Sequence, residues 1–263
     1  MRHLRKEYRG YIKDDETSVE PVAYKERKIP VWVCWWQGEK MMPLVPKVCI
    51  KNLRRNMLDE YELIVISEEN YNEYIHIPDY IIKKVNEGRI SITNFSDIIR
   101  FGLLSKYGGL WIDATCYTVE TLSDITSIEF YSSKQNKGND NKYVSRYRWA
   151  SYLIGGTQRL IFSNMYTLFL EYCRKEPVFV HYLLLDYFLC LIYEESLTCR
   201  QAVDKLEVTE PDILVLQEEL NDKYSEDRFP QGIFHKLSWK LKFNPYMEDN
   251  KTKTFWGEII DSI

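Results

Sequence analysis

The residues best suited to chemistry gather in one stretch, "SDIIRFGLLSKYGGLWIDAT", residues 96–115. It holds two carboxylates, Asp97 and Asp113, separated by a helical pattern, a Gly-Gly pair and a short apolar strand. The expected helix is about 15 Å long and the expected strand about 16 Å long. A tight turn at the Gly-Gly pair would therefore return Asp113 to the level of Asp97, so we expect the two carboxylates to meet.

A third polar group, Arg100, lies three residues after Asp97 and so on the same helix face. Two acids and a guanidinium would then share the carboxyl end of a strand, where open α/β sheets bind ligands. The alternative is a surface ion pair and a turn residue. Phe101 and Leu104 share that helix face. The pair should therefore be partly buried, and because burying charge is costly, this favours function.

This group of side chains suits a divalent cation that holds a diphosphate. Mg²⁺ and Mn²⁺ prefer oxygen ligands, and one or two protein carboxylates suffice when phosphates supply the rest. Such a cation neutralises a diphosphate leaving group as a glycosidic bond breaks. We therefore expect Mn²⁺ or Mg²⁺ as a cofactor.

The flanking pattern predicts an α/β fold. Residues 29–36 and 61–67 are β-branched and apolar, as in buried strands, and residues 43–56 between them have helical spacing. This alternation favours a parallel sheet covered by helices. The remaining expected elements are a helix at 78–88, strands at 110–114, 129–134 and 151–156, and helices from 158 to 195, including a buried helix over the apolar run 178–193.

Length and charge predict one main domain, residues 29–263, after a polar, basic appendage at residues 1–28. With a net charge of −4, no global charge draws the chain to nucleic acid, and we expect none as a partner. The basic segments 1–13 and 235–242 could rest on an acidic membrane surface or be solvated charged tails.

The six cysteines show no CxxC spacing and lie mostly in apolar runs, which is typical of reduced thiols in a cytosolic protein. The longest apolar run is interrupted by His181 and Asp186 and is too short for a membrane helix. We therefore expect a cytoplasmic protein, with peripheral contact at the inner face of the cell membrane as a further hypothesis.

Three segments resemble one known family. Residues 96–115 are similar to the signature of the glycosyltransferase family 32 sugar transferases, and more closely to their capsular polysaccharide synthesis branch. The segments "IPVWVCWWQGEKMMP" (29–43) and "FHKLSWK" (234–240) resemble the first strand and the C-terminal segment of that branch. The resemblance implies a GT-A nucleotide-diphosphosugar transferase fold, with a mixed, mostly parallel sheet flanked by helices and a helical C-terminal half.

The resemblance also implies a metal-dependent, retaining hexosyltransferase. Its donor would be a nucleotide-diphosphosugar, with a UDP-sugar favoured, and its acceptor a growing polysaccharide or lipid-linked glycan. Asp97 and Arg100 fall where the family contacts the ribose and sugar of the donor. Asp113 matches the first acid of the Asp-X-Asp motif. Trp36 falls where relatives stack an aromatic ring on the base, and Trp35 is its nearest competitor.

Other positions carry weaker expectations. The resemblance places His235 and Lys236 where the C-terminal segment reaches the metal or the diphosphate; if that segment is helical, Lys236 and Lys240 share a face. Asp186 is a candidate for an acid that orients the acceptor, or it only hydrogen-bonds backbone. Thr115 is also a candidate metal ligand, but it departs from the wider family, which has a second metal-binding acid there. A threonine hydroxyl is a weaker, neutral ligand, so we expect weaker metal binding.

Alternative functions remain open. An Asp-nucleophile phosphatase fits "WIDAT" superficially, but Thr115 stands where that chemistry needs a proton-donating acid. A catalytically weak or inactive nucleotide-sugar-binding protein with the same fold would bind a donor without turnover. A toxin that glycosylates host proteins would share the "SD..R" and "GG" arrangement, but we find no export signal or delivery domain to support it.

Overall fold

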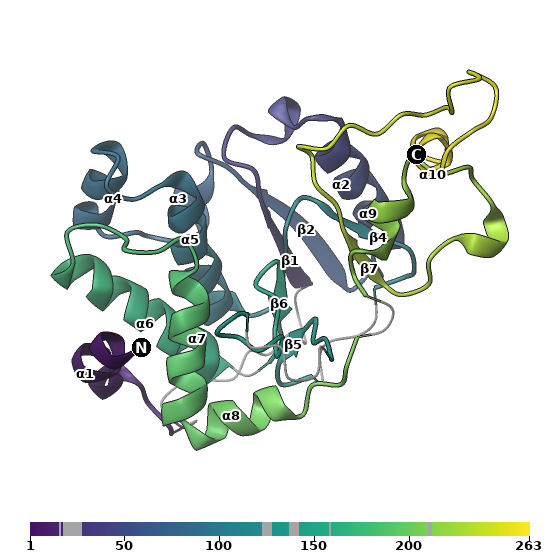
Figure 1. The fold of residues 1–263 in the computed structure, drawn as a ribbon. Coiled ribbons are helices and arrows are strands. Elements are labelled where there is room, and N and C mark those ends of the chain that lie inside the picture. Colours follow the sequence, from purple (N-terminus) through teal and green to yellow (C-terminus); the bar gives the residue numbers. More distant parts are fainter. Residues whose placement is uncertain (16, 18–27, 123–127, 137–141, 158, 210–211) are drawn as a thin grey trace.

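The computed structural model describes residues 1–15, 17, 28–122, 128–136, 142–157, 159–209 and 212–263. A central sheet has the strand order β2-β1-β3-β6-β5 (Figure 1). Its strands β1, β2 and β3 are parallel, and β6 is antiparallel to both β3 and β5. The strands are β1 (Ile29–Cys34), β2 (Tyr61–Ile66), β3 (Leu110–Ile112), β5 (Tyr131–Ser132) and β6 (Leu153–Gly155).

Helices flank this sheet, and a two-stranded sheet, β4 (Cys116–Thr118) with β7 (Phe234–Lys236), lies beside it. The mixed, mostly parallel sheet with flanking helices confirms the expected α/β class. The helices are α1 (Arg2–Tyr8), α2 (Leu44–Asn56), α3 (Tyr71–Tyr74), α4 (Asp79–Asn86), α5 (Ile92–Tyr107), α6 (Arg159–Lys175), α7 (Leu184–Glu195), α8 (Leu197–Asp204), α9 (Val215–Glu219) and α10 (Phe255–Asp261), with short 3₁₀ turns at Arg9–Tyr11, Glu39–Met41 and Glu226–Arg228.

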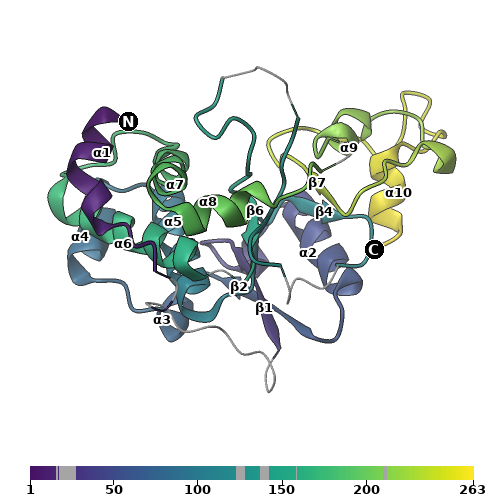
Figure 2. The ribbon, with the colours of Figure 1, turned by 90° about the horizontal axis from the view of Figure 1, so that it is seen from below.

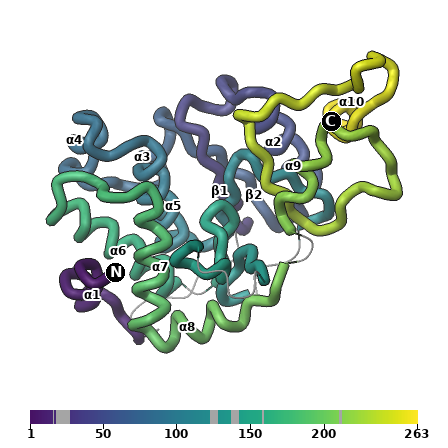
Figure 3. The backbone as a smooth tube through the Cα atoms, in the orientation of Figure 1, coloured from purple at the N-terminus to yellow at the C-terminus, as the bar shows by residue number. Residues whose placement is uncertain are grey.

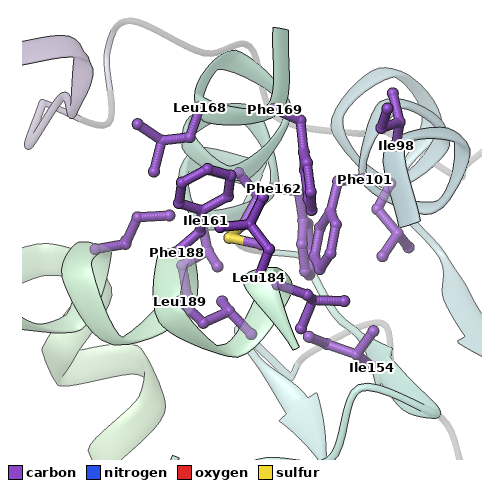
Figure 4. Packing of buried hydrophobic residues seen from close by; sticks show 14 of the residues in the cluster. Ile98, Phe101, Ile154, Ile161, Phe162, Leu168, Phe169, Leu184, Phe188 and Leu189 are labelled. Atoms are coloured by element: carbon purple, nitrogen blue, oxygen red, sulfur yellow. The ribbon is translucent and has the colours of Figure 1, made fainter. Parts of the chain in front are cut away.

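Strand alternation divides the core into two layers, because successive side chains of a strand point to opposite faces. Trp32 and Trp111 point toward α5, α6 and α7, in the cluster of which Figure 4 shows part. Val31 and Ile112 point the other way, into a second cluster that includes Leu53 of α2. Figure 2 shows α5, α6 and α7 on one side of the sheet and α2 on the other.

The Gly-Gly pair makes the tight turn that the sequence predicts. Gly108 and Gly109 have φ values of 68° and 86°, in the left-handed region that favours glycine. The backbone N–H of Gly108 also closes α5 by donating to the carbonyl of Leu104. A Cβ on Gly109 would lie 2.1 Å from the carbonyl oxygen of Pro30, so glycine lets β3 lie close beside β1.

The N-terminal segment packs onto the fold over residues 2–11. Leu4 and Tyr8 are buried in the cluster formed by α5, α6 and α7, and Arg5 forms ion pairs with Glu194 and Glu195. These residues therefore do not extend from the fold as a polar appendage, whereas residues 18–27 lie outside the described part. The domain boundary at residue 28 stays a prediction. The two ends of the chain lie on opposite sides of the molecule (Figure 3).

The apolar run 178–193 is helical only in part, which corrects the expected single helix. Helix α7 begins at Leu184, because the preceding chain forms a turn at His181. The N–H of Leu183 donates to Nδ1 of His181, and the N–H of Leu184 donates to the carbonyl oxygen of His181. Among the described residues, no helix is long and apolar enough to span a bilayer. All six cysteines are free thiols, as expected.

Candidate functional site

A cavity of about 280 Å³ opens at the carboxyl ends of β1 and β3. Strands β2 and β3 lie on opposite sides of β1, so this is the topological switch point at which open α/β sheets bind ligands. The cavity is lined by side chains from strand ends, from α5, from α7 and from the C-terminal segment. Seven of them were expected site residues: Trp35, Asp97, Arg100, Asp113, Thr115, Asp186 and Lys236.

Arg100 joins the two carboxylates at the centre of this cavity. Its Nη1 donates to Oδ1 of Asp97 at 2.8 Å, and its Nη2 donates to Oδ1 of Asp113 at 3.3 Å. The guanidinium lies over the ring of Trp111, with 4.6 Å between its carbon and the ring centroid. Helix α5 and strand β3 therefore run in opposite directions, as predicted, and Arg100 bridges Asp97 and Asp113.

The two carboxylates differ in environment and so in pKa. Burial, together with the negative charges of Asp113 and Asp186, raises the pKa of Asp97 to about 7, against the opposing effect of Arg100. Burial also acts on Asp113, but Lys236 and Arg100 outweigh it and lower its pKa to about 2. Asp113 is therefore a permanent anion at neutral pH, whereas Asp97 titrates near it.

Lys236 reaches Asp113 from the far end of the chain. Strand β7 pairs with β4 so that Lys236 stands opposite Cys116, which follows the turn formed by residues 113–115. Its Nζ donates to Oδ2 of Asp113 at 2.9 Å and to Oγ1 of Thr115 at 2.7 Å. Burial alone would lower the pKa of Lys236, but Asp113 outweighs it and the pKa is raised. The ammonium is therefore a fixed positive charge.

Asp186 lies on the other wall of the cavity, in the first turn of α7. Its Oδ1 accepts a hydrogen bond from Nε1 of Trp149 at 2.9 Å. Burial raises the pKa of this carboxyl, and the indole and Arg100 act against the rise. The partner is a side chain rather than the backbone, so Asp186 is held facing the same cavity as Asp97 and Asp113.

Of the two candidate stacking residues, Trp35 lines the cavity and Trp36 does not. Trp36 packs against Tyr71 and Phe95, with ring centroids 5.5 and 5.4 Å away. Trp35 instead meets Trp239 edge to face at 5.9 Å. The position of Trp36 therefore does not support the expected preference for it. Trp35 and Trp36 follow directly after β1, and their side chains pack against different clusters.

His235 does not lie with the expected metal ligands. It is fully buried, and its Nε2 lies 3.1 Å from the carbonyl oxygen of Gln231. Burial lowers its pKa, so the imidazole is held neutral. Residues 234–236 are a strand rather than a helix, so alternation sends His235 and Lys236 to opposite faces. Because these residues form a strand, the condition under which Lys236 and Lys240 would share a helical face is not met.

Sequence reasoning missed Trp111 and Trp239. Nε1 of Trp111 donates to Oδ1 of Asp113 at 3.0 Å. Trp111 and Trp239 both line the cavity. The i, i+2 spacing of Trp111 and Asp113 on one strand was the available signal, because it puts both side chains on one face. Trp239 follows β7 in an irregular segment, where spacing carries no such signal.

The side chains around Asp113 do not fit a resident Mn²⁺ or Mg²⁺. In the described ranges, no three His, Cys, Asp or Glu side chains lie close enough together to hold a metal ion. Oδ1 of Asp113 accepts from Arg100, and Oδ2 from Lys236. A cation bound there would face both groups, and two like unit charges 4 Å apart near a protein surface repel by about 4 kcal/mol.

Comparison with known proteins decides the family. Residues 1–259 match the family described as "Capsular polysaccharide synthesis protein". The chain belongs to this family. No curated protein matches it in sequence.

Two solved structures are similar to this member of the capsular polysaccharide synthesis family. "PaToxG Glycosyltransferase" shares 14% identity at a TM-score of 0.44, over 80% of this chain and 88% of that one. "WbbM bifunctional glycosytransferase apo structure" shares 9% identity at a TM-score of 0.33, over 57% of this chain and 35% of that one. Both likenesses are distant, at 14% and 9% identity.

Proposed function

We propose that this protein is a retaining glycosyltransferase that moves a hexose from a nucleotide-diphosphosugar, with a UDP-sugar favoured, to a growing polysaccharide or lipid-linked glycan. One observation carries this proposal: Arg100 and Lys236 converge on Asp113 in a cavity at the switch point of the sheet. Two fixed cations there suit a diphosphate, and membership of a capsular polysaccharide synthesis family supports glycosyl transfer as the reaction.

The reaction exchanges one bond at the anomeric carbon. The bond from C1 to the diphosphate oxygen breaks and its electron pair stays on that oxygen, while the acceptor hydroxyl oxygen bonds to C1 on the same face. The hydroxyl proton passes to the released diphosphate. Lys236 and Arg100 stabilise the charge that develops on the leaving group, and such fixed charges are usually the largest catalytic contribution.

Asp97 and Asp186 are proposed to orient the two sugars. Both carboxylates line the cavity, and neither is bound by an ammonium group. Asp97 would accept hydrogen bonds from hydroxyls of the donor, and Asp186 from the acceptor. Holding both reactants in place lowers the barrier without a covalent intermediate.

The proposed setting is the cytoplasmic face of the cell membrane, with peripheral contact to a lipid-linked acceptor. Exposed apolar side chains near the cavity support it: Tyr182 and Trp239 line the cavity and are 68% and 46% exposed. The alternative is a requirement for Mn²⁺ or Mg²⁺, and assays with and without the metal test it.

The test is donor turnover by purified protein. UDP- and GDP-sugars are supplied one at a time, with and without Mn²⁺, and released nucleoside diphosphate is measured. Asp113→Asn should lower release about 100-fold, because Lys236 and Arg100 lose the shared anion that positions them. The exposed Asp59→Asn is the matched control and should keep wild-type rates. Equal release by the Asp113 variant would overturn the site, and binding without release would indicate an inactive sugar-binding protein.

A further inference from the structure

We infer that Lys236 takes the place of a divalent cation in this protein, so that the diphosphate of the donor is bound and neutralised without Mn²⁺ or Mg²⁺. This inference rests on the proposed function and assigns stabilisation of the diphosphate charge to Lys236. The inference starts from the Lys236 ammonium group, which the fold places between Asp113 and Thr115.

The first support is the location of the ammonium group. Its nitrogen contacts Asp113 and Thr115, the first and third residues of the turn that follows β3. These are the two oxygen-bearing side chains that a cation at this strand end would use. The second of them is a neutral hydroxyl that accepts a hydrogen bond from the ammonium, so a lysine suits this pair better than a metal does.

The second support is how firmly the chain holds Lys236. Its backbone pairs with Cys116 in the β4–β7 sheet, and its N–H donates to the carbonyl of Ile213 at 2.8 Å. On the next residue, the N–H of Leu237 donates to the carbonyl of Thr115 at 2.8 Å. The charge is therefore positioned before any ligand arrives, and electrostatic stabilisation works best with groups positioned in this way.

The third support is that the ammonium can still reach a ligand. The Lys236 side chain is 21% exposed and lines the cavity. An ammonium has three N–H donors, and Asp113 and Thr115 take two, so one is left for a phosphate oxygen. The ring of Tyr152, 5.2 Å from the nitrogen, supports the group from another side.

Arg100 completes the cationic pair on the opposite oxygen of Asp113. Its Nε is buried and has no hydrogen-bond partner among the described residues. Arg100 and Lys236 share Asp113, and Arg100 also pairs with Asp97, whose pKa of about 7 leaves it partly protonated at neutral pH. The two cations and these direct partners therefore carry an excess of positive charge beside the strand end. That charge is what a diphosphate needs and what a divalent cation would otherwise supply.

The experiment is calorimetric binding of UDP and of GDP to the full chain, in EDTA and in Mn²⁺. For the nucleotide that binds, we expect affinities in the two buffers to agree within about threefold. Lys236→Met keeps an unbranched side chain that is one heavy atom shorter and has no charge. It should weaken binding about 30-fold in either buffer, since it removes a charge-assisted hydrogen bond. Lys240→Met is the matched control, because Lys240 is exposed and follows β7 closely, and it should bind as wild type does.

The outcomes separate this inference from the proposed function. If wild type binds a nucleotide only with Mn²⁺, the inference is overturned and the proposed function stands. If wild type binds neither nucleotide in either buffer, both are overturned. The wild-type comparison does not depend on whether Lys236→Met folds. Titration of Mn²⁺ into the ligand-free chain adds a readout independent of the nucleotide: we expect no saturable binding, and one tight site lost in Asp113→Asn would contradict us.

Discussion

Nζ of Lys236 lies 2.9 Å from Oδ2 of Asp113, although 123 positions separate them in the chain. Two short antiparallel strands, β4 and β7, make this possible by bringing the C-terminal segment to the end of β3. This contact also gives Thr115 a different role from the one that the sequence suggests. A residue that looked like a missing metal ligand accepts a hydrogen bond from the lysine, so Asp113 and Thr115 together hold an ammonium.

Base stacking is predicted to depend on Trp35 rather than Trp36. Stacking of a base on an aromatic side chain contributes about 1–3 kcal/mol, so Trp35→Ala should weaken UDP binding about tenfold or more. Trp36→Ala should leave binding near wild type and instead lower the free energy of unfolding by about 3 kcal/mol, because Trp36 packs on Tyr71 and Phe95. Calorimetry and urea denaturation measure the two effects. The reverse pattern would restore Trp36 as the stacking residue.

Local patterns predict most of the central sheet and the pairing of Asp97 with Asp113. Both follow from rules of short range: the rise per residue of helix and strand, the turn at Gly108 and Gly109, and the i, i+3 spacing that brings in Arg100. Segments within about 20 residues of each other could therefore be placed without a structure.

The C-terminal side of the site could not be placed in the same way. The i, i+4 spacing of Lys236 and Lys240 would give a shared face only in a helix, whereas pairing with β4 makes residues 234–236 a strand. Strand pairing over more than 100 residues leaves no periodic signal in the sequence, because either periodicity fits a three-residue segment. The resemblance, and not spacing, suggested both His235 and Lys236 for the site, and alternation along β7 separates them, so that only Lys236 lines the cavity.

Stability is predicted to depend on pH through Asp97. Its pKa is raised to about 7 in the folded state by burial, Asp113 and Asp186, against Arg100, and is about 3.9 in an unfolded chain. The folded state thus binds the proton more tightly, so this group's contribution falls as pH rises from about 4 through 7. Asp97→Asn removes this contribution. Melting temperatures from pH 5 to 8 should show wild type losing stability relative to the variant, and parallel curves would contradict the assignment.

Asp186 is predicted to act on the acceptor and not on the donor. Asp186→Asn keeps an oxygen for the indole N–H of Trp149 but loses the negative charge, so packing should survive. We expect glycan transfer to fall about 10- to 100-fold, with UDP-sugar binding within about twofold of wild type. Parallel assays of transfer and of donor binding measure this. A matching loss of donor binding would instead place Asp186 on the donor side.

The close approach of β3 to β1 is predicted to make Gly109 irreplaceable, and Gly88 provides a matched control. Both have positive φ, 86° and 70°, but a Cβ would meet the Pro30 carbonyl oxygen at 2.1 Å at Gly109 and nothing within 4 Å at Gly88. Gly88→Ala should therefore cost only the backbone strain, about 1–2 kcal/mol. Gly109→Ala adds a clash with the backbone of a central strand, so we expect a loss of about 4 kcal/mol or more in the free energy of unfolding by urea denaturation. Gly109 comes directly before β3, and Asp113 directly follows that strand, so a shift of the strand would move Asp113. A folded Gly109→Ala protein should therefore bind UDP more weakly than Gly88→Ala. Equal losses of stability in the two variants would mean that the strands can separate to admit a methyl group without disturbing the site.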